Sequence, residues 1–387
     1  MSALVEARWQ PPPRWHFHNP VELNVGRGSR HGLSDRLSGR SILIVSTQRG
    51  RRQLTGDPAL SPLLTRNEVH WVDDVRENPG LSDLQAQINR LAAYQFNSVV
   101  AFGGGSVMDA AKVLNAALAP QCREHRLSEL LDHPGLHAQA TPAPLYTVAT
   151  TSGTGSEVTP FATVWNHEIR KKLSLAGSAV WPTAAYVDAA LTDSVPLDVT
   201  ISTGLDAINQ AAESIWNRNA NSISLALATR ALQLGFAALP ALAQGEGGQL
   251  ARDQMAEASL CAGLAISHTR TALCHSISYP LTAHFGVPHG LACAFTMPAV
   301  LRCNLEAEDG RFSQLALALT GHPATDGLVD MFDRLHDDLQ VRERVRTFLP
   351  SLEGLLALET EMYTPGRADN NLHPIDGVRP ILLASWE

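Results

Sequence analysis

The chain has 387 residues, more than a single hydrophobic core usually serves, so we expect two domains. Apolar residues make up 44% of it and charged residues 18%, as in ordinary globular proteins, which argues against a disordered or fibrous chain. The formal net charge of -8 argues against a nucleic-acid partner. It does not exclude an anionic small substrate, because a pocket sets its own local field.

The rest of the composition predicts a soluble, reduced protein. The five cysteines are scattered without a CxxC pair, so we expect free, mostly buried thiols. Near the N-terminus, Glu6, Arg8 and a proline run stand where a secretory signal needs an apolar core, and we expect a cytoplasmic protein. The most apolar long stretch, residues 225–243, contains Arg230 and Pro240, which predicts a packed helix and no membrane span.

The first half of the chain alternates short apolar runs with amphipathic segments, as in a mostly parallel sheet with crossover helices. Apolar spacing predicts helices over residues 81–95 and 106–119. The predicted strands are residues 41–46, 69–75, 98–102, 144–150, 161–165 and 184–188.

After about residue 193 the strand signals vanish, and apolar residues recur at intervals of three and four. The sequence therefore predicts an α/β domain over residues 1–192 and an all-helical domain over residues 193–387.

Three glycines, Gly103, Gly104 and Gly105, follow one predicted strand and open a predicted helix. Without side chains they let backbone N–H groups approach a phosphate at the positive end of the helix dipole. The pattern is neither GxGxxG nor a P-loop, so a tight strand-to-helix turn is the competing interpretation.

A second loop that leaves a strand, TVATTSGTGSEVTPF, is dense in hydroxyl groups and glycines. Such a loop can wrap a polar ligand, although a lone loop of this kind is more often a surface connection. Because ligands of open α/β sheets bind beyond the carboxyl ends of the strands, two such loops together favour a ligand site.

Histidines in the second half suggest a metal site. His275 and His289 flank a bend divided by prolines, and we expect His275 to end one helix and His289 to start the next element. With Asp206, they would suit Fe(II) or Zn(II) with a position open for substrate. Such an ion would polarise a carbonyl oxygen, so a metal together with a dinucleotide suggests carbonyl reduction. A satisfied core or surface histidine is the competing interpretation for each residue alone.

The ordered motifs GGGSxxDxxK, TTxGTGSEVT and GLDA, followed by two histidines 14 positions apart, resemble the iron-containing, group III alcohol dehydrogenases. The resemblance runs from about residue 24 to residue 304. The segment ALCHSISYPLTAHFGVPHGLACAF further resembles the phosphonate-metabolism branch, the phosphonoacetaldehyde reductase-like enzymes. The resemblance implies a Rossmann-like dinucleotide-binding domain, a helical metal-binding domain of the dehydroquinate synthase-like architecture, an active site between them, and a homodimer.

For the metal, the resemblance implies the ligand positions Asp206, Gln210, His275 and His289. Gln210 stands where the family has a fourth ligand, a histidine, so it is either a weak oxygen ligand or holds a water. Tyr279 stands where many members have a histidine that relays the proton.

For the substrate, Lys172 and Arg270 could each pair with a phosphonate, Arg270 in bidentate fashion. An ion pair on an outer helix face is the competing interpretation for Arg270. His268 would lie about two turns, or ~10 Å, before His275 on the same helix face, too far to share the metal but able to line the cleft.

For the cofactor, Thr47 stands where NAD-using members often have an aspartate that bonds the ribose hydroxyls. Arg49, Arg51 and Arg52 lie nearby, so we expect NADPH rather than NADH, with a solvated loop as the competing interpretation. The other predicted cofactor-binding residues are Gly103, Gly104, Gly105, Ser106, Asp109, Thr150, Thr151, Gly153 and Thr154.

The leading hypothesis is a metal-assisted, NAD(P)H-dependent reductase of a small aldehyde, with reduction of phosphonoacetaldehyde to 2-hydroxyethylphosphonate as its specific form. Another small-alcohol or polyol dehydrogenase, or a dehydroquinate synthase-like lyase, is the second hypothesis. The third is a metal-free, non-catalytic binding protein. None of them involves nucleic acid or a membrane.

Overall fold

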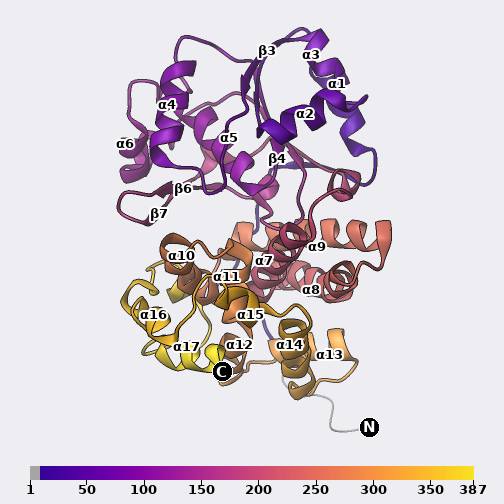
Figure 1. Cartoon of the computed structure of the whole chain (residues 1–387), viewed down its shortest axis with the longest axis vertical. Coiled ribbons are helices and arrows are strands. Elements are labelled where there is room, and N and C mark those ends of the chain that lie inside the picture. The colour runs from indigo at the N-terminus through magenta and orange to yellow at the C-terminus, as the bar shows by residue number, and fades with distance from the viewer. Residues whose placement is uncertain (1–8) are drawn as a thin grey trace. The chain divides into compact units, whose positions relative to one another are not determined.

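The computed structural model describes residues 9–387 (Figure 1). The expected absence of a secretory signal falls partly on residues 1–8, which lie outside the described residues. The chain divides into two compact units. One unit is Asn19–Val195, and the other combines Pro196–Glu387 with the N-terminal segment that ends at His18. The predicted division at 192/193 lies close to Val195, but residues 9–18 belong to the helical unit, whereas the sequence grouped them with the α/β domain.

The first unit is built around a six-stranded sheet in the order β1-β8-β5-β4-β2-β3, with every pair parallel. Ile42 and Ile44 of β2 enter the core on one face, and Leu43 and Val45 enter the core on the other, because side chains alternate along a strand. Helices cover both faces (Figure 1), which confirms the predicted Rossmann-like class. The strands are β1 (Glu22–Val25), β2 (Ser41–Val45), β3 (Glu68–Val72), β4 (Ser98–Gly103), β5 (Leu145–Ala149), β6 (Phe161–Asn166), β7 (Lys171–Ala176) and β8 (Ala184–Val187). The helices are α1 (Gly32–Arg36), α2 (Gln48–Gly56), α3 (Pro62–Arg66), α4 (Leu81–Leu91), α5 (Gly105–Ala117) and α6 (Leu127–Asp132).

Three strands depart from the sequence prediction. The predicted strand at 161–165 forms as β6, but it pairs antiparallel with β7 in a separate two-stranded sheet. Neither β7 nor β1 was predicted, because β1 is largely exposed and β7 mixes exposed polar residues with apolar ones.

The strand order reverses between β2 and β4. The chain continues from β2 to β3 on one side of the sheet, and from β4 to β5 on the other. Open α/β sheets bind ligands beyond the carboxyl ends of the strands at such a point. Thr47 follows β2 and Gly103–Gly105 closes β4, so the topology brings two of the predicted cofactor segments to neighbouring strand ends.

Beyond residues 9–18, which form no helix, the described part of the second unit is mainly helical, as predicted, and has one large apolar core. Its long helices α7, α8 and α9 pack on one another, and glycines permit the close approach of α7 to α8. A Cβ on Gly204 would meet Leu239 at 2.5 Å, and one on Gly235 would meet Ile208 at 2.7 Å. The helices are α7 (Leu197–Ile215), α8 (Ser222–Ala243), α9 (Gly248–Thr269), α10 (Leu273–Phe285), α11 (His289–Phe295), α12 (Met297–Leu305), α13 (Arg311–Thr320), α14 (Asp326–Asp338), α15 (Val341–Arg346), α16 (Leu352–Leu356) and α17 (Arg379–Trp386).

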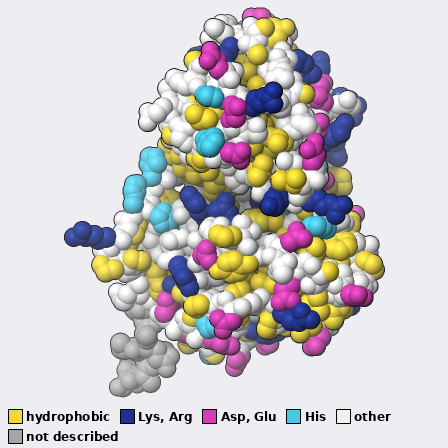
Figure 2. Space-filling view, turned by 90° about the vertical axis from the view of Figure 1, so that its left-hand side faces the viewer, with side chains coloured by type: hydrophobic (Ala, Val, Ile, Leu, Met, Phe, Trp, Pro, Cys, Tyr) yellow, Lys and Arg dark blue, Asp and Glu magenta, His cyan; other side chains and the backbone are white. Residues whose placement is uncertain are grey.

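Helix α8 and the charged surface bear on possible partners. Of the described helices, α8 is long and apolar enough to cross a membrane, and 44% of its most apolar window is buried. It packs against α7 and α9 in the apolar core, and core helices of globular proteins meet the same criteria. On the face shown in Figure 2, acidic and basic side chains are interspersed, so this face offers no broad basic surface.

A buried lysine of α5, Lys112, hydrogen-bonds the hydroxyl-rich loop of residues 147–161 and holds it against the helix. The Nζ atom of Lys112 donates to Ser156 Oγ and to the carbonyl oxygens of Thr159 and Phe161, at 2.9 Å each. Burial lowers the pKa of Lys112 to about 8, although the charges of Asp109 and Glu157 oppose this shift. The loop is therefore held at several points by one side chain.

Replacing this lysine tests its structural role. Lys112→Ala leaves three buried acceptors without their donor, so we expect the free energy of unfolding of the first unit to fall by about 2–4 kcal/mol. Lys171→Ala, at an exposed position on β7, should change it by less than about 0.5 kcal/mol. Denaturant titration of both variants measures the difference, and equal losses would contradict the role given to Lys112.

Candidate metal centre and cofactor site

Four side chains from three helices meet in the helical unit: Asp206 of α7, His275 of α10, and His289 and Cys293 of α11. One potential ligand atom from each lies within 4.8 Å of all the others. Asp206, His275 and Cys293 are each at most 3% exposed, while His289 is half-buried. A carboxylate, two imidazoles and a thiol that converge in a buried place form a donor set typical of a transition-metal site.

The orientation of His275 is set by Glu213, two turns after Asp206 on α7. His275 Nδ1 lies 2.7 Å from Glu213 Oε2, which also accepts from the backbone N–H of Ala272 at 2.7 Å. Glu213 Oε1 accepts from the backbone N–H of His275 at 3.1 Å. With Nδ1–H donated to Glu213, Nε2 faces Asp206, as in metal sites where a carboxylate orients a histidine ligand.

Helix α11 reaches the cluster because it lies almost against the backbone of α7. A Cβ atom on Gly290 would come within 1.8 Å of the carbonyl oxygen of Ser202. Only glycine allows this approach, which places His289 and Cys293, one helical turn apart, beside Asp206.

The charges of the cluster fit a divalent cation. Asp206 Oδ1 is buried without a hydrogen bond from any described residue, and it lies 3.4 Å from His275 Nε2. Burial would raise the pKa of Asp206, but the neighbouring His275 and His289 lower it. Burial would likewise raise the pKa of the Cys293 thiol, yet the same imidazoles lower it to about 7. A cation bound here would therefore lie beside two anionic side chains, the Asp206 carboxylate and the Cys293 thiolate.

The sequence prediction for the bend at His275 is wrong. His275 lies in the first turn of α10, which runs on through Pro280, instead of ending a helix. The break comes earlier, at Arg270, whose φ of 62° ends α9. His268 therefore belongs to α9 and does not share a helix face with His275, and its ring lies 5.8 Å from that of Phe17.

The other predicted residues of the helical unit lie near the cluster or near its helices. Gln210 hydrogen-bonds the Asp206 carboxylate and helps to lower its pKa. Tyr279 stacks on His289, with ring centroids 6.4 Å apart and an interplanar angle of 15°. Arg270 is exposed in the segment between α9 and α10. Lys172 lies in the other unit, on β7 opposite Trp165. The roles of these residues stay predictions.

In the α/β unit the two glycine-containing loops are packed into one another. A Cβ on Gly104 would meet Thr151 Oγ1 at 2.8 Å, and one on Gly105 would meet Thr154 Cγ2 at 2.5 Å. The loops therefore lie together at the start of α5, where backbone N–H groups point outward from the helix.

The Asp109 carboxylate is occupied within the protein. Its two oxygens accept from Ser156 Oγ at 2.7 Å and from the backbone N–H of Thr163 at 2.8 Å. These contacts give Asp109 a part in holding the hydroxyl-rich loop in place. Ser106 Oγ similarly accepts from the N–H of Asn78, at 3.3 Å.

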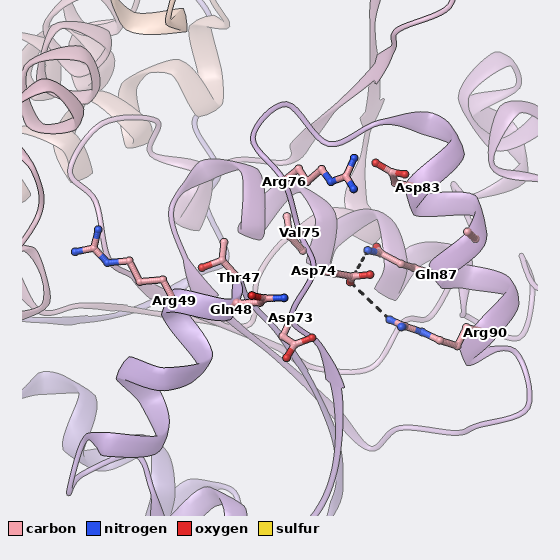
Figure 3. Close-up of a pocket in the computed structure, with 11 residues that line it drawn as sticks. Thr47, Gln48, Arg49, Asp73, Asp74, Val75, Arg76, Asp83, Gln87 and Arg90 are labelled. Atoms are coloured by element: carbon pink, nitrogen blue, oxygen red, sulfur yellow. Dashed lines mark hydrogen bonds and ion pairs between the residues drawn. The ribbon is translucent and has the colours of Figure 1, made fainter.

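A pocket of about 560 Å³ opens beside the ends of β2 and β3 (Figure 3). Thr47 caps α2 by accepting from the N–H of Gly50 at 3.0 Å, and it forms an isolated bridge with Asp74. Of the three predicted arginines, only Arg49 lines the pocket. Arg51 instead pairs with Asp73 at 2.7 Å. The lining residues are Thr47, Gln48, Arg49, Asp73, Asp74, Val75, Arg76, Asp83, Ala86, Gln87 and Arg90.

Sequence reasoning missed several of these residues. Cys293 is one of the five cysteines expected to be free and mostly buried, although its position one turn after His289 is a signal that could have found it. Glu213 lies nine residues after the start of the GLDA motif at Gly204, and nothing local connects it to His275. Asp73 and Asp74 fall in the predicted strand at 69–75, and no role is predicted for Arg76 and Arg90.

Comparison with known families agrees with this fold. The model of the iron-containing alcohol dehydrogenases matches residues 20–189, and that of the family's C-terminal part matches residues 200–349. The chain belongs to the iron-containing alcohol dehydrogenase family, as predicted.

Individual relatives agree with this assignment. The chain is 37% identical over 249 residues to the probable alcohol dehydrogenase EutG of Salmonella typhimurium, which covers 64% of this chain and 62% of that protein. It is 38% identical over 237 residues to the phosphonoacetaldehyde reductase of Streptomyces viridochromogenes, 59% of either chain. The match thus spans less than two thirds of either relative.

Among solved structures, the sulfoacetaldehyde reductase of Bifidobacterium kashiwanohense in complex with NAD+ has a TM-score of 0.85 and 26% identity. The likeness covers 97% of this chain and 98% of that one. The predicted divalent metal and NAD(P)H agree with an iron-containing family and with a relative solved with NAD+.

The contact between Glu213 and His275 yields a test of the metal centre. In Glu213→Gln one acceptor oxygen is replaced by an NH2 group, so the imidazole loses its orienting carboxylate, and we expect metal affinity to fall about 10- to 100-fold. Competition with a chromophoric chelator measures the dissociation constant. Glu257→Gln, an exposed glutamate on α9, is the control, and equal affinities in the two variants would contradict the role of Glu213.

Proposed function

We propose that this protein is a metal-assisted, NAD(P)H-dependent alcohol dehydrogenase that works as a reductase of a short aldehyde carrying an anionic group. Phosphonoacetaldehyde, reduced to 2-hydroxyethylphosphonate, is the specific substrate proposed. The observation that carries the proposal is the buried cluster of Asp206, His275, His289 and Cys293 in a member of the iron-containing family.

The residues of the cluster suit carbonyl reduction. A divalent metal held by Asp206, His275 and His289 would polarise the aldehyde oxygen, and a reduced nicotinamide cofactor would supply the hydride. Glu213 holds His275 in the orientation that this requires. Tyr279, stacked on His289, is the candidate for handing a proton to the alcohol oxygen. A phenol ordinarily has a pKa of about 10, so this transfer depends on the charges around it.

Arg270 supports an anionic substrate. Its φ of 62° and ψ of 179° fall in a region that side-chain-bearing residues rarely enter, at a cost of about 1–3 kcal/mol. The strain is maintained by hydrogen bonds to its carbonyl oxygen from Asn217 Nδ2 at 3.2 Å and Thr269 Oγ1 at 3.0 Å. Strain of this kind is common where a functional side chain is held in place.

The charges around the Arg270 guanidinium also favour an anionic substrate. Partial burial and the positive charge of Arg367 both lower its pKa. Within residues 9–387 no carboxylate forms an ion pair with it, which argues against the competing interpretation of an outer-face ion pair. Two arginines that repel each other, without a paired carboxylate, form a place where an oxyanion would be favourable.

Two relatives support this substrate class by their names, since phosphonoacetaldehyde and sulfoacetaldehyde are both two-carbon aldehydes with a terminal oxyanion. The similarity to EutG is equally high, so an uncharged short alcohol or aldehyde is the second candidate substrate. The behaviour of Arg270 distinguishes the two candidates.

Arg270→Ala should raise KM for phosphonoacetaldehyde about 10- to 100-fold, because a charge-assisted pair with the phosphonate is lost. KM for propionaldehyde should change little. Steady-state NADPH oxidation measures both, and Arg230→Ala, an exposed arginine on α8 paired with Glu257, is the matched control. If KM rises equally for the charged and uncharged aldehydes, Arg270 does not recognise the anion. Absence of turnover with any short aldehyde would refute the proposed function.

For the cofactor, the pocket beside β2 and β3 supports NADPH. Asp73 is paired with Arg51, and Asp74 lies 3.7 Å from Arg90 and accepts from Gln87 at 2.9 Å. In contrast, Arg49 and Arg76 line the pocket with no ion pair to any described carboxylate. Figure 3 shows the Arg49 guanidinium directed away from the other labelled side chains, and it donates to the carbonyl oxygen of Ser194 at 3.2 Å. At Thr47, a carboxylate would repel a 2′-phosphate.

Thr47→Asp tests this preference. Aspartate caps a helix as well as threonine does, so α2 should be preserved. A carboxylate there would repel the 2′-phosphate and bond the ribose hydroxyls of NADH, so the ratio of kcat/KM for NADPH to that for NADH should fall at least about tenfold. An unchanged ratio would place the 2′-phosphate away from Thr47. The homodimer and the cytoplasmic location also remain proposals.

A further inference from the structure

We propose that Cys293 is a protein ligand of the metal, and that the centre is a carboxylate, two-imidazole and thiolate site that prefers zinc to iron. The inference rests on the proposed metal-assisted function for its setting. It concerns a residue that the family resemblance does not place among the ligands.

The position of Cys293 carries the inference. Its Sγ atom lies 3.8 Å and 3.7 Å from the two ring nitrogens of His289, and within 4.8 Å of the ligand atoms of Asp206 and His275. The side chain is 0% exposed. It shares a face of α11 with His289, and Gly290 lets that helix lie close against α7.

Gln210 explains why a sulfur ligand is needed. It stands one turn after Asp206, where the resemblance places a histidine ligand, and its amide is engaged with the Asp206 carboxylate. A neutral amide is a weak ligand for a transition metal, whereas a thiolate is a strong one. Cys293 therefore supplies the strong donor that this chain lacks at residue 210.

The charge count also favours a thiolate. A buried divalent ion held by Asp206 and three neutral donors would keep one uncompensated positive charge. With Cys293 as thiolate, two anionic ligands balance the ion, and the thiol proton leaves to solvent when the metal binds. The substrate oxygen would enter as a fifth ligand, as catalytic zinc sites allow.

A sulfur donor changes metal selectivity. Thiolate ligands favour zinc, and divalent zinc binds nitrogen, oxygen and sulfur donors more tightly than iron(II) does. When the metal-stripped full-length protein is offered equal zinc(II) and iron(II) under argon, we expect at least about tenfold more zinc to be retained. The Cys293→Ser variant should show a smaller preference.

Cobalt(II) reports directly on the ligand. The cobalt-loaded wild-type protein should show near-ultraviolet sulfur-to-cobalt charge-transfer absorption. Cys293→Ser should lose this band, whereas Cys261→Ser, a half-buried cysteine of α9, and Gln210→Ala should keep it. Should Cys293→Ser fail to fold, X-ray absorption of the zinc-loaded wild type gives an independent answer, since it should show one sulfur at about 2.3 Å.

The outcomes separate the two proposals. Absence of sulfur from the wild-type zinc shell, a cobalt band that survives in Cys293→Ser, or no uptake of cobalt would each overturn the assignment of Cys293. A protein that shows the sulfur band but oxidises no NADPH with any aldehyde would support the ligand and refute the proposed function.

Discussion

The carboxylate of Glu213 is the contact on which the metal centre depends. One buried charge accepts from two backbone N–H groups at the start of α10 and from the imidazole of His275. Because Glu213 and Asp206 are on the same face of α7, one rigid helix carries both a ligand and the group that orients the next ligand. The distance between Asp206 and His275 is therefore set mainly by α7, through the contact of Glu213 with His275.

The third helix is brought in by backbone contact. At Gly290, α11 lies so near the carbonyl of Ser202 that no side chain fits between them. The cluster is thus complete within the helical unit, whereas the loops proposed to hold the cofactor belong to the α/β unit. The metal cluster and the proposed cofactor loops are thus each supported by a separate hydrophobic core. Metal binding and cofactor binding can therefore be measured independently.

The sequence predicted what is local and missed what depends on distant contacts. Four of the six sheet strands are buried apolar runs and could be predicted, and the less buried β3 was also predicted, whereas β1 exposes three of its four residues. Asp206, His275 and His289 could be found from residue type and order. The spacing of Cys293 from His289 hints at a shared role, but only the packing of α11 against α7 brings its sulfur into the cluster. The role of Glu213 depends on a partner 62 residues away, which no periodicity reports.

The interlocking of the two glycine-containing loops limits how this family can diverge. Gly104 and Gly105 each face a threonine of the opposite loop so closely that a methyl group added to either glycine would collide with it. A substitution in one loop is tolerated only with a smaller residue in the other. Residues 104 and 151, and residues 105 and 154, should therefore change together among homologues, as two coupled pairs of positions across the two loops.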